Sequence, residues 1–315
     1  MKIAIIGPGA LGCLLAASLT IKLDQSGQKK YAPDLWLLDY KSERAQFLRE
    51  QGLILEEGGQ KKTCSIKATA DPKNIGPVDL VILCVKSPQV AAGLQVAAKL
   101  FQTDTLLLTL QNGIGHLEML KDRQKLPSIV LGVTAQGANM VAPGHVRHAG
   151  DGLTRIGFLN SASFSKSLHL AKVCNLLNYG GIETVIVDNI TDYIWSKLLI
   201  NVGINALTAI HRCPNGNLLD SGELQEQLSA AVAEGEAVAR ALGIHLIEDP
   251  LALTLDVSRK TGQNLSSMLQ DVNNRRPTEI DSINGEISAA GRKLGIPTPV
   301  NDELIEKVKE IELAY

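Results

Sequence analysis

The chain has 315 residues, 45% of them hydrophobic, and a formal net charge of −2 at pH 7. This length favours two domains, and the near-neutral charge does not favour nucleic acid or an anionic membrane as a partner. The five cysteines are scattered without metal-ligand or disulfide spacing, so reduced thiols in a soluble, cytoplasmic protein are expected. We expect neither a signal peptide nor an apolar run long enough to span a bilayer.

A glycine-rich turn follows the first predicted strand, at residues 2–6. The turn Gly7-Pro8-Gly9-Ala10-Leu11-Gly12 leads into an apolar helix that continues to about residue 21. In this setting the first glycine permits a tight turn, the second lets the backbone approach a pyrophosphate, and the third lets the helix close on the sheet. The free N–H groups of the helix would bind phosphates. The pattern therefore predicts a Rossmann-type dinucleotide site, with a chance glycine turn as the alternative.

The end of the second predicted strand bears on cofactor choice. A polar loop is predicted at residues 22–33, before a strand at 35–38 that ends in Asp39, Tyr40 and Lys41. An acid at this position normally accepts hydrogen bonds from the adenosine ribose and favours NAD, whereas a nearby basic residue accommodates the 2′-phosphate of NADP. Asp39 and Lys41 are both candidate cofactor contacts, and electrostatics alone favours NAD.

The pattern then continues as a helix at 42–51 and a hairpin at 53–70. The apolar run at 78–85 is typical of a parallel strand that is covered on both faces. Lys86 follows this strand. Because ligands of open α/β sheets bind at the carboxyl ends of the strands, Lys86 is a candidate cofactor or substrate contact, although an ordinary solvated lysine fits as well.

Another strand end, after residues 105–110, carries Asn112 and then glycines. An amide here can approach the nicotinamide or its ribose, and the alternative is a turn asparagine in the left-handed conformation. Short strands at 130–157, a helix at 165–179 and a strand at 184–187 complete a predicted first domain of residues 1–189.

The second half, residues 190–315, is predicted to be an all-helical substrate and catalytic domain. Its expected helices are 193–210, 223–242, 250–262, 265–272, 278–294 and 301–314. The chain therefore reads as an α/β protein, with an N-terminal Rossmann-type domain followed by a helical C-terminal domain.

Three polar side chains interrupt the apolar helix that begins near Trp195. Lys197, Asn201 and Asn205 are spaced four apart, so they form one stripe on a helix that is otherwise apolar all round. One interpretation is structural, with amides that bridge helices and a lysine that extends to solvent. The other is a substrate pocket with a cationic proton donor.

A second polar stretch contains Thr278, Glu279 and Asp281. Thr278 and Asp281 have the spacing of a capping box, which predicts that a helix starts here. By itself, the spacing is also consistent with Glu279 merely complementing the helix dipole.

Taken together, several motifs resemble the ketopantoate reductase family over the whole chain. They are Gly7-Pro-Gly-Ala-Leu-Gly12, Gln111-Asn-Gly113, Trp195-Ser-Lys197 with Asn201 and Asn205, Cys213-Pro-Asn-Gly216, and Ser266-Ser-Met-Leu-Gln-Asp271 through Thr278-Glu-Ile-Asp-Ser-Ile-Asn-Gly285. The resemblance implies NADPH-dependent reduction of 2-dehydropantoate to (R)-pantoate, a step towards pantothenate and coenzyme A.

The resemblance also implies residue roles. Lys197 matches the general acid, and Glu279 matches the acid that interacts with substrate and lysine. Asn112 matches a contact to cofactor and substrate together. The groups that hold the substrate's carboxylate and hydroxyls match Asn201, Asn205, Asn264 and Ser267.

One departure from the family concerns the cofactor. The family commonly has an arginine near the end of the second strand for the 2′-phosphate, and here Asp39, Tyr40 and Lys41 occupy that region. The choice between NADPH and NADH therefore stays open. The alternative functions are a reductase of another branched 2-oxo acid and a non-catalytic dinucleotide sensor. The expected partner is a small-molecule 2-oxo acid, with no nucleic acid and no membrane, and homodimer formation is left open.

Overall fold

A computed structural model describes residues 1–25, 32–121, 127–160 and 162–315. The chain forms two compact units. The first contains Met1–Gln111 and Met119–Ile190, and the second contains Asn112–Glu118 and Thr191–Tyr315. A short segment from the first half of the sequence therefore packs with the C-terminal helices. Residues 26–31 of the polar loop predicted at 22–33 lie outside the described residues. Residues 22–25 belong to the first helix, which ends at Gln25 and not near residue 21 as predicted.

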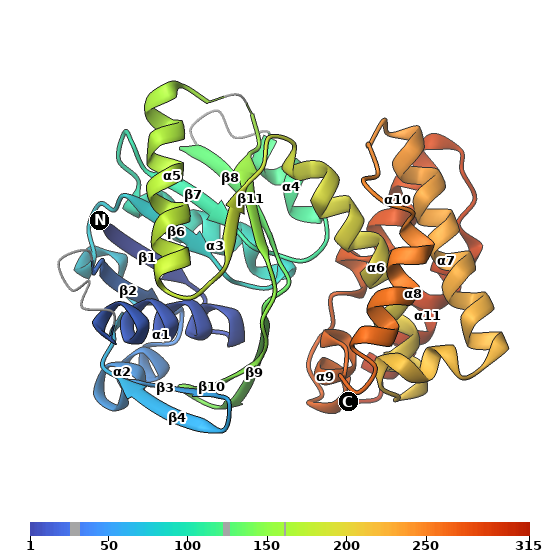
Figure 1. The fold of residues 1–315 in the computed structure, drawn as a ribbon, viewed down its shortest axis with the longest axis horizontal. Coiled ribbons are helices and arrows are strands. Elements are labelled where there is room, and N and C mark those ends of the chain that lie inside the picture. The colour runs from blue at the N-terminus through green and yellow to red at the C-terminus, as the bar shows by residue number, and fades with distance from the viewer. Residues whose placement is uncertain (26–31, 122–126, 161) are drawn as a thin grey trace. The chain divides into compact units, whose positions relative to one another are not determined.

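The first unit is built on an eight-stranded sheet (Figure 1). Its strands are β1 (Lys2–Ile6), β2 (Asp34–Leu38), β5 (Lys67–Thr69), β6 (Leu80–Leu83), β7 (Leu106–Thr109), β8 (Ser128–Thr134), β11 (Thr154–Phe158) and β12 (Thr184–Ile186). Their order is β12-β11-β8-β7-β6-β1-β2-β5, and neighbours pair in parallel except for β8 and β11. All residues of β6 and β7 are buried, as the continuous apolar runs predicted.

A four-stranded sheet with the order β4-β3-β10-β9 lies in the same unit. Its strands are β3 (Leu53–Glu57), β4 (Gln60–Cys64), β9 (Gly137–Ala142) and β10 (His145–Gly150). The β3–β4 pair confirms that a hairpin follows α2 (Ser42–Gln51), and it turns at Gly58 and Gly59, both of which have positive φ. The prediction that the hairpin continues to residue 70 is wrong, because residues 67–69 instead pair with β2 in the large sheet.

Helices of the first unit connect these strands. They are α1 (Ala10–Gln25), α2 (Ser42–Gln51), α3 (Val90–Ala97) and α5 (Phe164–Tyr179). The bounds of α2 are those predicted. The helix α4 (Gly115–Lys121) begins in the segment that packs with the second unit. Neither α3 nor α4 was predicted, because each is too short to show a clear helical period.

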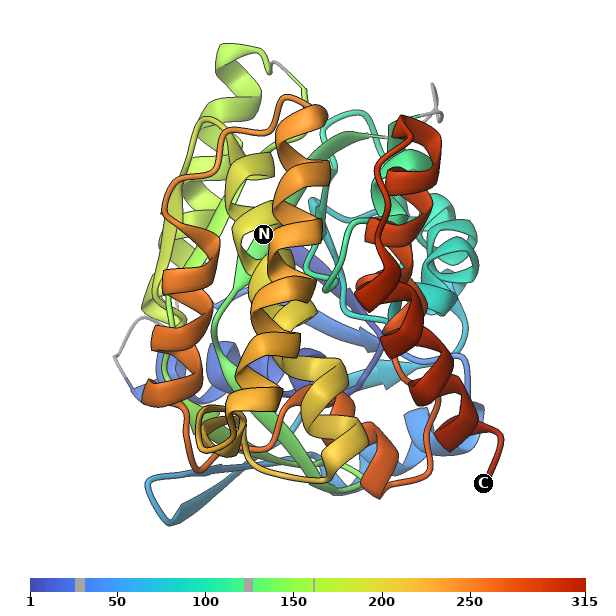
Figure 2. The ribbon, with the colours of Figure 1, turned by 90° about the vertical axis from the view of Figure 1, so that its right-hand side faces the viewer.

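The second unit is helical, and residues 187–315, all of which are described, contain no strand. Its helices are α6 (Ile190–His211), α7 (Gly222–Ala241), α8 (Pro250–Lys260), α9 (Ser267–Asn273), α10 (Asn284–Leu294) and α11 (Pro299–Glu312) (Figure 2). The helices α7 and α8 approach α6 closely at Gly203. A Cβ there would come within 2.8 Å of a Val232 side-chain carbon and 2.9 Å of one of Thr254.

The helix α6 is unusually apolar for its length. By length and composition, α6 could cross a membrane, so the expectation that no run has this property is wrong. However, 67% of its most apolar window is buried inside the protein. A helix that is apolar all round and surrounded by other helices is the core helix of a domain.

The helix predicted at 278–294 is wrong at its start. The structure has a 3-10 turn, η6 (Ile280–Ser282), and α10 begins only at Asn284. Ile283 between them has φ −112° and ψ −88°, which is not helical. The Thr278 hydroxyl accepts from the N–H of Ile280 at 3.2 Å, so no capping box forms. The break leaves Glu279 outside a regular helix.

A buried amide network ties four helices of the second unit together. The Asn284 side chain donates to the Val202 carbonyl of α6 at 3.2 Å and to Asn301 Oδ1 of α11 at 3.0 Å. Asn301 in turn donates to the Ala231 carbonyl of α7 at 3.1 Å and to Glu234 at 2.7 Å. Because both asparagines are fully buried, losing either partner would leave unsatisfied polar groups. Asn284 is therefore a structural residue.

The buried histidine of α4 makes stability depend on pH. His116 is 3% exposed, and burial lowers the pKa of its imidazole from 6.5 to about 4. Between these values the unfolded chain binds a proton that the folded chain does not, so the free energy of unfolding falls as the pH falls. From pH 7 to pH 5 the loss from this group is about 2 kcal/mol.

Urea unfolding at pH 7 and pH 5 tests this expectation. The variant His116→Gln does not titrate, so its loss of stability over this interval should be smaller than that of the unchanged protein. His245→Gln, which alters an exposed histidine, is the control and should retain the full loss. Equal losses in the unchanged protein and His116→Gln would contradict the expectation.

Candidate active site

The polar stripe of α6 lies on a helix whose other faces are in the core. Trp195, Leu198 and Val202 are buried, whereas Lys197 and Asn201 are half-buried. This burial pattern excludes a lysine that simply extends into solvent. The stripe therefore forms part of a polar site within the second unit.

An amide joins the lysine to a carboxylate. Lys197 Nζ donates to Asn112 Oδ1 at 2.9 Å, and Asn112 Nδ2 donates to Glu279 Oε2 at 3.3 Å. The three residues come from α6, the segment 112–118 and the turn before η6. Residues far apart in the sequence thus form one hydrogen-bonded set, in which the two partners of Asn112 fix which way its amide points.

The loop that carries Asn112 depends on its glycines. Gly113 has φ 76°, and a Cβ there would come within 2.0 Å of the Ser282 carbonyl oxygen. A Cβ at Gly115 would come within 2.5 Å of Glu286 Oε1. At Gly113 only glycine permits this approach to the backbone, whereas the Glu286 carboxylate ends a flexible side chain that can move. The Asn-Gly-x-Gly pattern therefore brings the loop against η6 and α10, which places Asn112 beside Lys197.

The electrostatics of Lys197 suit a proton donor. Burial lowers the pKa of its ammonium from 10.5 to about 8, and the charge of Glu279 opposes this shift. Glu279 is 9% exposed, so its charge acts in a poorly hydrated environment. A donor with a pKa close to the working pH transfers a proton most effectively. Lys197 can therefore hold a proton at neutral pH and still release it.

The other predicted substrate residues lie on α6, at the start of α9 and in the loop before it. The Asn205 side chain donates to Ser267 Oγ at 3.5 Å. Beneath them, the Thr208 hydroxyl donates to Ser266 Oγ at 2.7 Å, which ties α6 to the capping residue of α9. Among the described residues, the side-chain amides of Asn201 and Asn264 have no hydrogen-bond partner, so both can bind a ligand.

The Cys213-Pro-Asn-Gly216 turn has a structural role. The N–H of Asn215 donates to the Asn264 carbonyl, and the N–H of Gly216 donates to the Gly262 carbonyl, both at 3.0 Å. A Cβ at Gly216 would come within 2.9 Å of the Gly262 Cα. The turn therefore holds the loop that carries Asn264.

The first unit contains the glycine turn. Gly7 has φ 98°, and a Cβ at Gly12 would come within 2.2 Å of the Gly7 carbonyl oxygen. A Cβ at Gly9, in contrast, would meet nothing within 4 Å, so the backbone is open there. This arrangement at the start of α1 fits a dinucleotide pyrophosphate. Pro8, Ala10 and Leu11 complete the turn, and Lys86 is half-buried at the end of β6.

Asp39 forms an ion pair with Arg44, a residue that the sequence did not single out. Its carboxylate accepts from Arg44 Nη2 at 2.7 Å, from Arg44 Nε, and from the N–H of Lys41 at 3.1 Å. The hydrogen bond to Asp39 raises the pKa of Arg44. Asp39 is 4% exposed, whereas Lys41 is exposed. The available signal was an arginine in the first turns of a helix that starts just after a strand-end acid.

Both parts of the chain match models of one family. Residues 3–161 match the model described as ketopantoate reductase PanE/ApbA, and residues 189–312 match the model of its C-terminal part. The chain belongs to the ketopantoate reductase family.

Relatives support this membership along the whole chain. A 2-dehydropantoate 2-reductase of Halobacterium salinarum is 33% identical over 98% of both chains, and one of Vibrio cholerae is 31% identical over 100% of this chain and 99% of its own. The crystal structure of a PanE/ApbA family ketopantoate reductase from Ralstonia eutropha has a TM-score of 0.88 at 29% identity, with 100% and 99% of the two chains covered. The structure of D-mandelate dehydrogenase with NADH and anilino(oxo)acetate gives 0.89, also at 29% identity and with the same coverage.

The lysine–amide–carboxylate set of this family member predicts a measurable coupling. Glu279→Gln removes the charge that raises the pKa of Lys197, so that pKa should fall below about 8. Titration of protein labelled with 13C at lysine Cε, with the signal assigned through Lys197→Met, measures it. Glu226→Gln removes an exposed charge on α7 and should leave the titration unchanged. An unchanged or higher pKa in Glu279→Gln would show that Glu279 does not act on Lys197.

Proposed function

We propose that this protein is a 2-dehydropantoate 2-reductase, which reduces 2-dehydropantoate to (R)-pantoate, a step towards pantothenate and coenzyme A. The observation that carries the proposal is the hydrogen-bonded set of Lys197, Asn112 and Glu279 in a member of the ketopantoate reductase family. Residues 1–189 would bind the cofactor and residues 190–315 the substrate, with Asn112 contributed from the first half.

The proposed chemistry assigns a task to each of these residues. A nicotinamide cofactor held at the glycine turn of residues 7–12 would supply hydride to the keto carbon, and negative charge would then develop on the keto oxygen. The ammonium of Lys197 stabilises that charge and donates the proton. Asn112 holds the ammonium in place, and Glu279 favours its charged form.

Neutral hydrogen-bond donors and acceptors would bind the substrate. Asn201, Asn205, Asn264 and Ser267 offer amide and hydroxyl groups that do not titrate near neutral pH. Such groups can bind the carboxylate and hydroxyl of a 2-oxo acid without competing for the catalytic proton. The two amides without protein partners, Asn201 and Asn264, are the strongest candidates for direct contact.

A second candidate is the reduction of another branched or aromatic 2-oxo acid. The structural likeness to D-mandelate dehydrogenase favours it, because a similar fold in that protein was seen with NADH and an oxoacetate. The lysine and amides would serve either substrate, and only the apolar groups around them would differ.

The direct test follows the absorbance of NADPH in the presence of 2-dehydropantoate. We expect turnover, with kcat/KM falling as the pH rises above about 8, because the donor Lys197 loses its proton. Lys197→Ala should lower kcat by about two to four powers of ten. Lys293→Ala, which alters an exposed lysine on α10, is the control and should retain full activity. Turnover only with other 2-oxo acids would select the second candidate, and cofactor binding without any turnover would favour a sensor.

For the cofactor, we propose NADPH rather than NADH. The support is that the carboxylate of Asp39 accepts hydrogen bonds from Arg44. An NAD-specific site would use that carboxylate to bind the ribose hydroxyls. Arg44 and the exposed Lys41 then place positive charge where a 2′-phosphate would bind.

Cofactor preference can be tested at the same arginine. Arg44→Ala frees Asp39 and removes a phosphate partner, so the ratio of kcat/KM for NADPH to that for NADH should fall at least tenfold, a difference of about 1.4 kcal/mol. Arg49→Ala, an exposed change on the same helix, should leave the ratio unchanged. A preference for NADH in the unchanged protein would contradict the assignment.

A further inference from the structure

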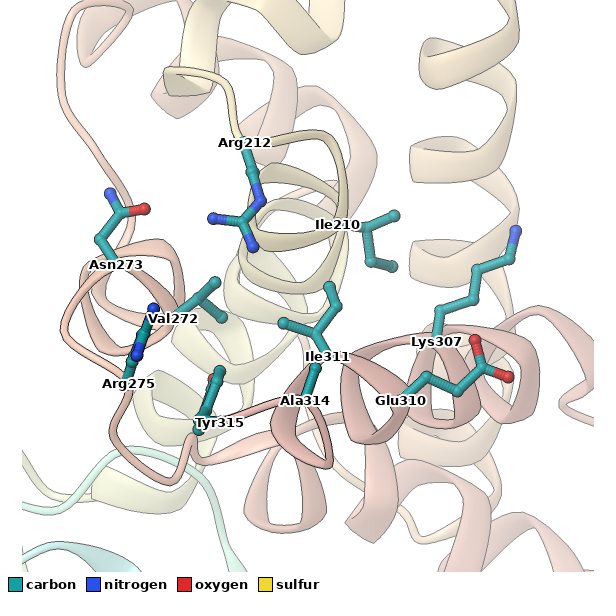
Figure 3. A pocket seen from close by; sticks show the side chains of 10 residues that line it. All are labelled: Ile210, Arg212, Val272, Asn273, Arg275, Lys307, Glu310, Ile311, Ala314 and Tyr315. Carbon is teal, nitrogen blue, oxygen red and sulfur yellow. The ribbon is translucent and has the colours of Figure 1, made fainter.

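A cavity of about 670 Å³ lies within the second unit, and none of the proposed catalytic or substrate residues lines it. Its walls come from the last turns of α6 and α9 and from one side of α11. Ile210, Val272 and Ile311 give it an apolar surface (Figure 3). Arg212, Arg275 and Tyr315 supply its polar groups.

The two arginines occupy the same unusual backbone position. Each has φ 50°, and they are the only residues other than glycine with positive φ in the described part of the chain. Each follows a helix in the place where glycine is usual. The next N–H bonds back to a carbonyl of the last turn, Cys213 to Thr208 at 3.2 Å and Arg276 to Asp271 at 2.9 Å. A left-handed conformation is unfavourable for a residue with a Cβ, so the backbone alone would favour glycine at both places.

The charges in the cavity are unbalanced. Among the described residues, neither guanidinium group has a hydrogen bond or an ion pair. Lys307 pairs with Glu303 at 2.6 Å, and Glu310 is the acidic residue of the lining. Figure 3 shows the side chains of Arg212 and Arg275 extending toward the same space from the ends of their helices. Two guanidinium groups therefore face the cavity, and Glu310 is the one acidic side chain that lines it. Burial and the charges of Glu312 and Asp271 raise the pKa of Tyr315, so these two carboxylates also act at this edge of the cavity.

We propose that this cavity binds a small organic phosphate. Guanidinium groups match phosphate oxygens in two-pronged hydrogen bonds, and the apolar wall with the Tyr315 ring suits an aromatic or aliphatic body. The volume is in the range of small-molecule sites. None of the lining residues belongs to the set proposed for 2-dehydropantoate or for the dinucleotide.

The position of the cavity gives its ligand a structural effect. The helix α6 carries Lys197, Asn201 and Asn205, and α9 begins at Ser267, so the cavity joins the far ends of the two helices that hold the proposed substrate groups. A bound phosphate that contacts both arginines holds these two ends together. Binding therefore raises the thermal stability of the protein.

The test uses phenyl phosphate as the probe and isothermal titration calorimetry with the full chain, in the absence of NADPH and with NADPH at saturation. One molecule should bind in both conditions, more tightly than inorganic phosphate or phenol, and should raise Tm. In the double variant Arg212→Gly with Arg275→Gly, the affinity should fall at least tenfold. The Tm of the free double variant should be unchanged or higher, because glycine suits φ 50°. Arg240→Gln, an exposed change on α7, should bind as the unchanged protein does.

Four results of the binding experiments would overturn the proposal. They are no binding of phenyl phosphate, binding that survives in the double variant, binding that NADPH abolishes, and inorganic phosphate binding as tightly as phenyl phosphate. A marked loss of Tm in the free double variant would also overturn it, because the arginines would then belong to the fold.

Discussion

The buried ammonium of Lys197 is the constraint on which the helical unit depends. A cation on a core helix is costly unless polar groups are fixed around it, and here the carbonyl oxygen of Asn112 accepts its hydrogen bond. Asn112 can reach it because Gly113 lets its loop lie against the Ser282 carbonyl of η6. The break before α10 serves the same purpose, since it leaves Glu279 beside that amide. These local features thus converge on one hydrogen-bonded set.

The family motifs combine chemical and structural roles. Lys197, Asn112 and Glu279 can act on a substrate, whereas the turn at Asn215 and Gly216 only holds the loop of Asn264. Asn284 lies in the same signature and yet is fully buried, where its amide joins α6 to α11. The family motifs therefore include residues that hold the site in shape as well as residues that can react.

In the first unit, the candidate cofactor groups are backbone N–H groups and charged side chains, not the buried amides of the second unit. The glycine turn has an open backbone at Gly9 beside the N-terminus of α1, an arrangement that suits the pyrophosphate of a dinucleotide. The charges of Asp39, Lys41 and Arg44 lie just after β2, where we propose that selectivity between cofactors arises. The ion pair with Arg44 neutralises the carboxylate of Asp39, and the exposed Lys41 adds a positive charge beside it.

The sequence by itself determined the elements with a clear local signal. The glycine turn, the apolar strands β6 and β7, the helix α2 and the polar stripe of α6 each follow from periodicity, burial and glycine chemistry within about twenty residues. Tertiary structure decided what depends on distant partners. It placed residues 67–69 in the large sheet, divided the helix predicted at 278–294, and joined Asn112 to Lys197 across 85 residues. It also paired Arg44 with Asp39, five residues earlier in the chain. The sequence shows that these two charges are near neighbours, but the packing of α2 against the end of β2 decides that they meet.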